Sequence, residues 1–147
     1  MATRLHDNNY AIIIMGYKDI TSRYILKLIV TDIALYLFDM KLDKAELLET
    51  EKQRIENRQA DLVVKARQGE LDFILHIEIQ NDNQRIMPVR MLRYFTDITL
   101  AWPDIKVVQY LIYIGQAPLT MASGIELSKL SYHYDVIDMH QIDCSVF

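Results

Sequence analysis

Cysteine, proline and glycine are scarce in this chain of 147 residues. The single cysteine, Cys144, cannot form an intrachain disulfide and has no metal-type Cys/His spacing around it, which favours a reducing, cytoplasmic setting. Only 3 prolines and 4 glycines are present, which excludes a low-complexity or linker-rich chain. Basic residues are also in the minority, with 16 Lys and Arg against 20 Asp and Glu. The net charge of -4 excludes a basic coat for nucleic acid, although a local basic patch remains compatible with it.

Long apolar runs are missing as well. The run at residues 11–15 is short and follows Asp7 instead of a basic segment, so we do not expect a signal peptide. The longest apolar stretch, residues 24–38, contains Lys27 and Asp32 and is shorter than the ~20 residues that cross a bilayer. We therefore expect a soluble protein without a membrane span.

What remains is the composition of a globular domain, with 51% hydrophobic and 24% charged residues. We expect residues 1–18 to form an N-terminal extension, residues 19–143 a single domain and residues 144–147 a short C-terminal tail. Because no internal repeat or composition shift divides the central part, one hydrophobic core is expected there.

Apolar residues at helical spacing, from Ile25 to Tyr36, predict a helix over residues 21–39. The following segment, residues 41–58, is rich in Glu and Lys and allows two interpretations. Its propensities favour a polar helix. The alternative is a short edge strand over residues 45–50 followed by a loop.

Two β-rich segments come next, residues 60–66 and 71–80. Residues 67–70 predict a hairpin connection between them, in which Gly69 can adopt a positive φ. Alternation along the second strand puts Ile77 and Ile79 on one face. The other face carries His76, Glu78 and Gln80.

A second helix is predicted from Pro88 to Trp102, because proline is tolerated in a first helical turn and Pro103 ends the helix. Its apolar stripe contains Met91, Phe95, Ile98 and Trp102, and its polar stripe contains Arg90, Arg93, Tyr94 and Asp97. Residues 106–115 are typical of a buried strand, and residues 132–142 predict one more. This order predicts an α/β fold with a mixed sheet covered by helices.

The most informative polar residues are Asp61 and Glu78. Carboxylates on adjacent antiparallel strands can approach within about 5 Å on one face of a sheet, and such a pair suits magnesium. Gln80 projects from the same face as Glu78 and could contact a water or a phosphate oxygen there. The alternative is a solvated sheet face on which Lys65 and Arg67 pair with the acids.

The second predicted helix adds candidate donors. Arg90, Arg93 and Tyr94 could bind a phosphate at the same place, or the two arginines could simply face solvent. His76 shares a strand face with Glu78, and a hydrogen-bonded structural imidazole is the more common role for a residue in that position.

Three segments resemble successive motifs of one known group. They are Arg58-Gln59-Ala60-Asp61-Leu62-Val63, His76-Ile77-Glu78-Ile79-Gln80 and Met87-Pro88-Val89-Arg90-Met91-Leu92-Arg93-Tyr94. In order and spacing they are similar to the PD-(D/E)XK nuclease superfamily, in its recombination-promoting nuclease and transposase branch. The resemblance extends over about residues 19–143.

The resemblance implies a restriction-endonuclease-like core of helix, three antiparallel strands, helix and strand, which favours the edge strand over the polar helix. It implies that Asp61, Glu78 and the carbonyl of Ile79 hold Mg²⁺, for which Mn²⁺ could substitute. Gln80 takes the place of the superfamily's lysine, and Lys65 is a candidate for the missing cation. The implied reaction is hydrolysis of a DNA phosphodiester by metal-activated water.

Further expectations follow from the same resemblance. The superfamily often takes another acid from its first helix, for which Asp32 and Asp39 are candidates, although surface or capping roles are more common for such residues. Cutting both strands of DNA generally needs two active sites, so a homodimer is expected. Members of this branch are commonly longer than this chain, so its C-terminus could be truncated.

Three functional hypotheses remain open at this point. The first is a magnesium-dependent DNA endonuclease that acts in transposition or recombination. The second is a catalytically inactive relative that binds nucleic acid or a protein partner, which the neutral Gln80 and the acidic net charge favour. The third is a structural or oligomerisation domain that associates through a Met- and Tyr-rich apolar surface.

Overall fold

The computed structural model describes residues 25, 27–48, 61–143 and 145. The expected N-terminal extension, the start of the first helix, residues 49–60 and most of the C-terminal tail lie outside these described residues. Residues 27–38 are helical, which confirms the first predicted helix where it is described. Asp39 directly after it has a φ of 51°, a left-handed conformation that cannot continue the helix.

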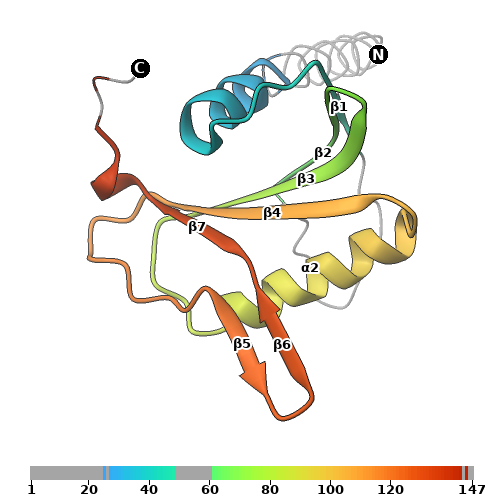
Figure 1. Cartoon of the computed structure of the whole chain (residues 1–147). Helices are drawn as coiled ribbons and strands as arrows, with labels where there is room; N and C mark the ends of the chain where they lie inside the picture. Colours follow the sequence, from blue (N-terminus) through green and yellow to red (C-terminus); the bar gives the residue numbers. More distant parts are fainter. Residues whose placement is uncertain (1–24, 26, 49–60, 144, 146–147) are drawn as a thin grey trace, which may run out of the picture.

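A mixed five-stranded sheet forms the centre of the fold (Figure 1). Its strands lie in the order β1-β2-β3-β4-β7. They comprise β1 (Lys44–Leu47), β2 (Leu62–Gln68), β3 (Leu71–Gln80), β4 (Lys106–Tyr113) and β7 (Asp135–Asp138). The pairs β1·β2 and β2·β3 are antiparallel, whereas β3·β4 and β4·β7 are parallel. The predicted α/β fold with a mixed sheet flanked by helices is therefore confirmed.

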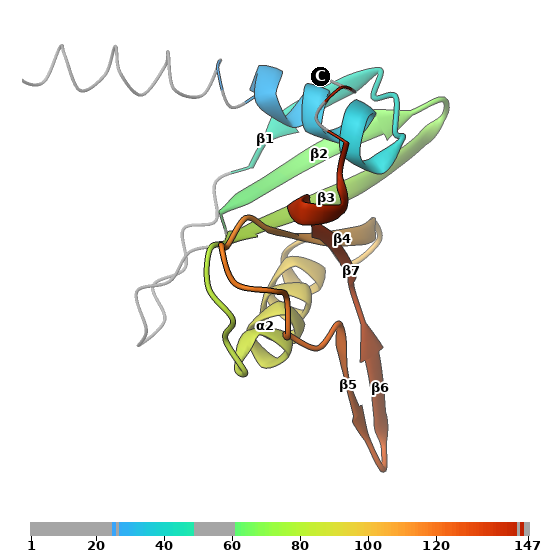
Figure 2. The same cartoon turned by 90° about the vertical axis from the view of Figure 1, so that its left-hand side faces the viewer.

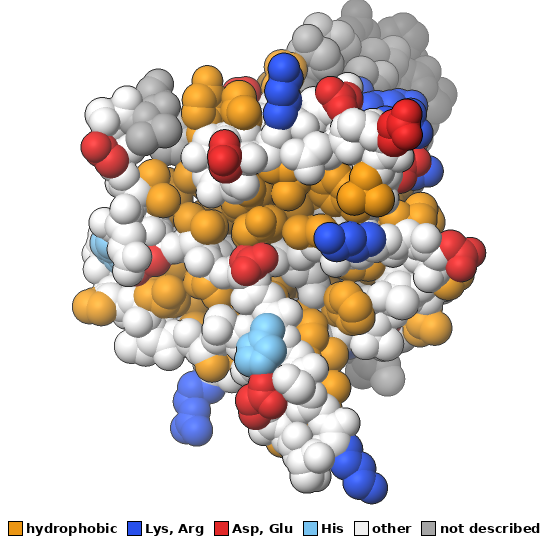
Figure 3. Space-filling view, in the orientation of Figure 1, with side chains coloured by type: hydrophobic (Ala, Val, Ile, Leu, Met, Phe, Trp, Pro, Cys, Tyr) orange, Lys and Arg blue, Asp and Glu red, His pale blue; other side chains and the backbone are white. Residues whose placement is uncertain are grey.

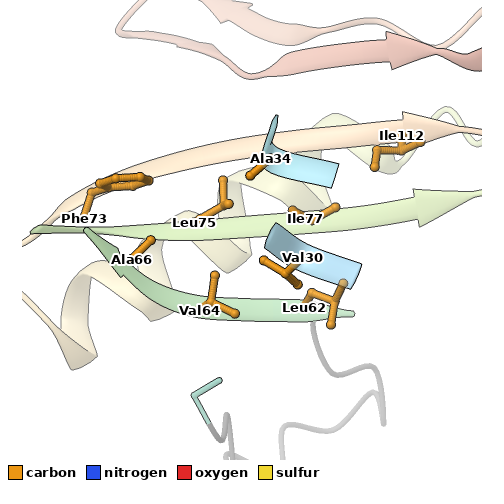
Figure 4. Close-up of a cluster of buried hydrophobic side chains, with 9 residues drawn as sticks. All are labelled: Val30, Ala34, Leu62, Val64, Ala66, Phe73, Leu75, Ile77 and Ile112. Atoms are coloured by element: carbon orange, nitrogen blue, oxygen red, sulfur yellow. The ribbon is translucent and has the colours of Figure 1, made fainter. Parts of the chain in front are cut away.

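The two helices cover opposite faces of this sheet (Figures 1 and 2). On one face the helix at residues 27–38 contributes Val30 and Ala34 to an apolar cluster with residues of β2, β3 and β4 (Figure 4). The strand members of this cluster are Leu62, Val64, Ala66, Phe73, Leu75, Ile77 and Ile112. Their alternation along the strands leaves the intervening side chains to the other face.

That second face is covered by α2 (Met87–Ala101). Pro88 lies in its first turn, and the Trp102 amide donates to the Ile98 carbonyl as the helix cap, so the predicted limits of this helix are confirmed to within one residue at each end. Met91 and Ile98 are buried against the sheet. Tyr94 is also buried, at 8% exposure, so its assignment to a polar stripe was wrong. On this face the described strands carry four buried polar residues, His76, Glu78, Gln80 and Gln109, among their apolar ones.

The charged segment after the first helix contains β1, whose residues pair with β2 from Lys44↔Arg67 to Leu47↔Val64. The edge-strand interpretation is thus confirmed for these residues, and the polar helix is wrong for them. Ala45 is buried while its neighbours Lys44 and Glu46 are exposed. Tertiary pairing with β2 overrides the helical propensity of this short Glu- and Lys-rich sequence.

The β2–β3 hairpin is longer than expected, because Arg67 and Gln68 belong to β2 and the loop contains only Gly69 and Glu70. Gly69 has a φ of +60°. A positive φ at the first residue of a two-residue loop matches the twist of the two strands. The loop is further tied to the chain before β1, because the Gly69 amide donates to an Asp43 carboxylate oxygen at 2.8 Å.

The C-terminal part differs from the single strand predicted over residues 132–142. It contains a separate hairpin of β5 (Gly124–Leu127) and β6 (Leu130–His133), which projects beyond α2 in Figure 2. After Tyr134 the chain enters the main sheet as β7, which is followed by a 3-10 turn, Met139–Gln141. The β-type composition of residues 130–138 does not reveal that the strand changes sheets midway.

Apolar side chains also reach the surface, and Figure 3 shows them spread across the middle of one face. Among the described residues before Asp39, the exposed large apolar side chains are Ile25, Leu28, Ile29, Leu35 and Tyr36. Within the described ranges, neither helix has the length and apolar character needed to traverse a bilayer.

Candidate active site

The two predicted metal ligands lie at the end of the β2–β3 hairpin that is remote from its loop. Asp61 immediately precedes β2, whose first residue, Leu62, is paired with Ile77 of β3. Continuing this antiparallel register places Asp61 opposite Glu78. The pairing of the two strands therefore brings together two acids that are 17 positions apart in the sequence.

Asp61 and Glu78 are held by two reciprocal hydrogen bonds that involve backbone amides. The Asp61 amide donates to Glu78 Oε1 at 2.8 Å. The Ile79 amide donates to Asp61 Oδ2, also at 2.8 Å. Each carboxylate is thus fixed by a main-chain donor at the strand end, so both side chains are oriented without direct contact between two negative charges.

Glu78 has one satisfied and one unsatisfied carboxylate oxygen. The residue is completely buried, and its Oε1 lies near two donors, the Asp61 amide and His76 Nε2 at 3.0 Å. Its Oε2 is buried and accepts no hydrogen bond from the described residues. The alternative of a solvated sheet face, on which Lys65 and Arg67 pair with the acids, is wrong. Glu78 is completely buried beneath α2, and Arg67 pairs with Asp72 at 2.6 Å. An unsatisfied buried carboxylate oxygen is costly and calls for a cationic partner.

Arg90 of α2 supplies positive charge on this side of the sheet. Its Nη2 lies 3.7 Å from Glu78 Oε2, which is within ion-pair range but longer than a hydrogen bond. Its Nη1 donates to Gln84 Oε1 at 3.0 Å, and its guanidinium carbon lies 6.0 Å from the ring centre of Tyr94. The Nε atom of Arg90 is buried without a hydrogen-bond partner among the described residues. Arg90 therefore retains donor capacity beside the acids.

Asp61 is exposed as a residue, but partial desolvation of its carboxyl raises its pKa, and the negative charge of Glu78 acts in the same direction. The Ile79 amide, Arg90 and His76 act in the opposite direction but do not cancel the effect of burial. Two carboxylates in one partly desolvated place disfavour each other's ionisation, which a bound cation would relieve.

A chain of buried polar groups leads away from Glu78. Gln109 of β4 approaches His76 Nδ1 with its Nε2 at 2.8 Å, and the same Nε2 donates to the Met91 carbonyl at 3.0 Å. Tyr132 of β6 donates its hydroxyl to Gln109 Oε1 at 2.6 Å. His76 also meets the ring of Tyr94 edge-on, with centroids 5.2 Å apart. The imidazole thus contacts β4 and α2, and Gln109 links it to the β5–β6 hairpin.

Of the other residues predicted for the site, three lie beside the two acids or contact their neighbours, and Arg93 lies further along α2. Gln80, at 9% exposure, ends β3 on the face of Glu78, and its side chain has no hydrogen bond within the described part of the chain. The Ile79 carbonyl leaves β3 on the same side as the Ile79 amide, toward Asp61. Tyr94 contacts both His76 and Arg90. Arg93 is partly buried further along α2, and none of the contacts above involves it.

The other candidate charges lie elsewhere. Lys65 is opposite Ile74, four residues along β2 from Asp61 and roughly 13 Å away at the rise of an extended strand. Asp32 and Asp39 are exposed and belong to the helix region that covers the opposite face of the sheet. The positively charged side chain beside the two acids is therefore Arg90 of α2, and not Lys65 of β2.

The donor set fits a hard divalent cation. Asp61 and Glu78 contribute carboxylate oxygens, one of which is buried and unsatisfied, and the Ile79 carbonyl points to the same side. Mg²⁺ commonly takes one or two protein carboxylates and completes its octahedron with water. No group of three or more His, Cys, Asp and Glu side chains in the described ranges has the arrangement of a metal site. A cation here would accordingly depend on water and the main-chain carbonyl as well as on the two carboxylates.

Sequence reasoning missed Gln109 and Tyr132. Gln109 is the one amide side chain within β4, Lys-Val-Val-Gln-Tyr-Leu-Ile-Tyr, and a polar residue in a strand otherwise buried on both faces calls for a hydrogen-bond partner. The sequence therefore contained a signal for Gln109. It contained none for the role of Tyr132, because that role depends on how the β5–β6 hairpin packs against β4.

Comparisons of the chain with models of protein families, with curated proteins and with solved structures give no match.

Proposed function

We propose that this protein is a metal-dependent endonuclease that hydrolyses phosphodiester bonds of DNA in transposition or recombination. The observation that carries the proposal is the pair Asp61 and Glu78, fixed by backbone amides with Glu78 Oε2 buried and unsatisfied. The resemblance of three motifs to the PD-(D/E)XK superfamily, in the same order along the chain, supports it. The substrate is expected to be DNA, and the cation Mg²⁺, with Mn²⁺ as a substitute.

The residues divide the work according to their chemistry. Asp61, Glu78 and the Ile79 carbonyl would hold the cation, which when bound lowers the pKa of a coordinated water and neutralises charge on the phosphoryl oxygens. Arg90 would bind a phosphate oxygen through its free donor capacity, as guanidinium groups do. Tyr94 supports Arg90 through ring contact and a hydroxyl 3.4 Å from Nη2.

Gln80 would orient the attacking water. Its amide can donate to and accept from a water, but it carries no charge and exchanges no proton near neutral pH. Proton removal then depends on the cation and the carboxylates alone, and we expect slower hydrolysis than a lysine in this place would give.

The neutral Gln80 also favours a second candidate function, that of an inactive relative that binds nucleic acid or a protein partner. In that case the acids and Arg90 would remain as a binding site.

The endonuclease proposal includes a homodimer, because cleavage of both DNA strands needs two active sites. It also places the protein in the cytoplasm.

Nicking of supercoiled plasmid in Mg²⁺ and in Mn²⁺ tests the proposal. The unchanged protein should convert supercoiled DNA to the nicked form only when a divalent cation is present, and Glu78→Gln should abolish this conversion. Glu70→Gln is the matched control, since Glu70 is an exposed acid in the hairpin loop. Absence of nicking by the unchanged protein in both ions contradicts the first function, and salt-dependent DNA binding without cleavage supports the second.

A further inference from the structure

The hydrogen bonds around Gln109 determine which way its side-chain amide points. The Nε2 group lies 3.0 Å from the Met91 carbonyl, an acceptor only, while Oε1 lies 2.6 Å from the Tyr132 hydroxyl. A reversed amide would set its oxygen against the Met91 carbonyl oxygen, which is repulsive. Met91 and Tyr132 together therefore hold the amide with its nitrogen toward His76.

This orientation fixes the tautomer of His76. An amide nitrogen can only donate, so His76 Nδ1, 2.8 Å away, must be the acceptor and carry no proton. The remaining nitrogen, Nε2, then carries the proton and donates to Glu78 Oε1 at 3.0 Å. The tautomer is assigned by the network of donors and acceptors, as it must be for a histidine.

The same contacts select the orientation of Glu78. Its Oε1 receives two hydrogen bonds, from His76 and from the Asp61 amide. Its Oε2 accepts no hydrogen bond from the described residues and lies 3.7 Å from Arg90 Nη2. A carboxylate that is anchored through one oxygen presents the other in a defined direction. Groups behind a ligand commonly orient it in this way and contribute about 10–100-fold to metal affinity.

We propose that Gln109 and Tyr132 are positioning residues of the Asp61–Glu78 site, which act by holding His76 as the Nε2-protonated tautomer. The effect of these two residues on cation binding rests on the proposed function, whereas the assignment of the His76 tautomer does not. Both residues are buried, at 6% and 8% exposure, and they come from β4 and β6, outside the β2–β3 hairpin that carries the acids. The β5–β6 hairpin is thereby linked to Glu78 through the Tyr132 hydroxyl, Gln109 and His76 in turn.

Nitrogen-15 NMR of the histidine side chains, recorded without added metal, tests the tautomer. In the unchanged protein, His76 Nδ1 should resonate as an unprotonated nitrogen and Nε2 as a protonated one. Gln109→Glu keeps the shape but replaces the donor by an acceptor, so it should put a proton on Nδ1. A spectrum of the unchanged protein with Nδ1 protonated, or one that Gln109→Glu leaves unaltered, overturns the proposal.

Calorimetric titration with Mn²⁺ provides the second readout. Gln109→Glu should weaken binding about tenfold or more, and Tyr132→Phe, which removes one hydroxyl, should weaken it by less. The matched control is Tyr134→Phe, because Tyr134 is a similarly buried tyrosine whose hydroxyl donates to the Ala122 carbonyl outside this network. Equal Mn²⁺ affinity in the unchanged protein and Gln109→Glu overturns the positioning role. Failure of the unchanged protein to bind Mn²⁺ contradicts the proposed function, and the tautomer is then judged from the NMR spectra alone.

Discussion

Asp61 and Glu78 are connected through a backbone amide: the Asp61 N–H lies 2.8 Å from Glu78 Oε1. The bond depends on the strand register, since Leu62 is paired with Ile77 in the next position. A shift of β3 by one residue relative to β2 would turn Glu78 to the opposite face of the sheet. An apolar neighbour of Glu78 would then lie opposite Asp61. The positions of the acids are therefore as well defined as the hairpin itself, and the apolar clusters on both faces fix that hairpin.

Asp61→Asn separates the structural role of this residue from cation binding. Asparagine keeps an oxygen for the Ile79 amide and removes a carboxylate whose pKa is raised by burial. Without metal the variant should therefore be slightly more stable at neutral pH, by about 1 kcal/mol or less. It should lose the rise in melting temperature that Mn²⁺ gives the unchanged protein. Thermal unfolding with and without Mn²⁺ measures both effects, with Asp104→Asn, at an exposed residue, as control. An equal Mn²⁺ effect in Asp61→Asn would show that Asp61 holds no cation.

Arg90→Gln should weaken DNA binding and reduce its salt dependence. Loss of one phosphate contact lowers the slope of log K against log salt by about 1, and it does so for every DNA sequence alike. Titration of labelled duplex at several salt concentrations measures the slope. Lys129→Gln, at the exposed tip of the β5–β6 hairpin, removes the same charge away from the acids and should leave the slope unchanged. An unchanged slope in Arg90→Gln would exclude Arg90 as a phosphate contact.

The Arg67–Asp72 pair predicts a small dependence of stability on pH. A hydrogen bond from Arg67 lowers the pKa of Asp72 below 3.8, its ordinary value. The ionised pair therefore contributes stability above pH 3.8, which is lost as the pH falls through the pKa of the folded state. Because the Arg67 and Asp72 side chains are 50% and 35% exposed, solvent screens the pair and the contribution is small. NMR titration of Asp72 should show its pKa return toward the ordinary value in Arg67→Gln. If Asp72 titrates identically in both proteins, this cross-strand pair does not form in solution.

Gly69→Ala should destabilise the protein by about 1 kcal/mol, the cost of a left-handed conformation for a residue with a β-carbon. The cost is conformational, because an added Cβ at Gly69, with its φ of +60°, meets no atom within 4 Å. Gly69→Asn should cost less, since asparagine adopts this conformation more readily. Urea unfolding of both variants measures the difference. Equal stability of Gly69→Ala and the unchanged protein would contradict the loop geometry.

The sequence predicted the parts of the molecule that local rules control. Pro88 and Pro103 bound α2 because proline restricts the backbone wherever it occurs. Alternation along β3 puts Glu78 on one face of the strand together with His76 and Gln80, which follows from local geometry alone. The pairing of Glu78 with Asp61 depends on the two-residue loop, whereas the sequence predicted a four-residue connection over residues 67–70.

The parts that depend on distant contacts could not be predicted in this way. Tyr94 shares a helical stripe with Arg90, yet it is buried because the neighbouring sheet carries His76, which its ring contacts. The separation of β6 from β7 depends on pairing of β7 with β4, which local propensity does not encode. The sequence named Lys65 as the candidate for the missing cation and Arg90 as a candidate phosphate contact, and only the packing of α2 places Arg90 beside Glu78.

Anomalous X-ray scattering from crystals of the protein grown with Mn²⁺ tests the central claim most directly. A single strong peak should lie between the carboxylates of Asp61 and Glu78, with oxygen ligands at roughly 2.1–2.2 Å, and crystals of Glu78→Gln should lack it. A Mn²⁺ peak elsewhere with none between these two side chains, or carboxylates on opposite faces of the sheet, would contradict the claim that they hold a cation.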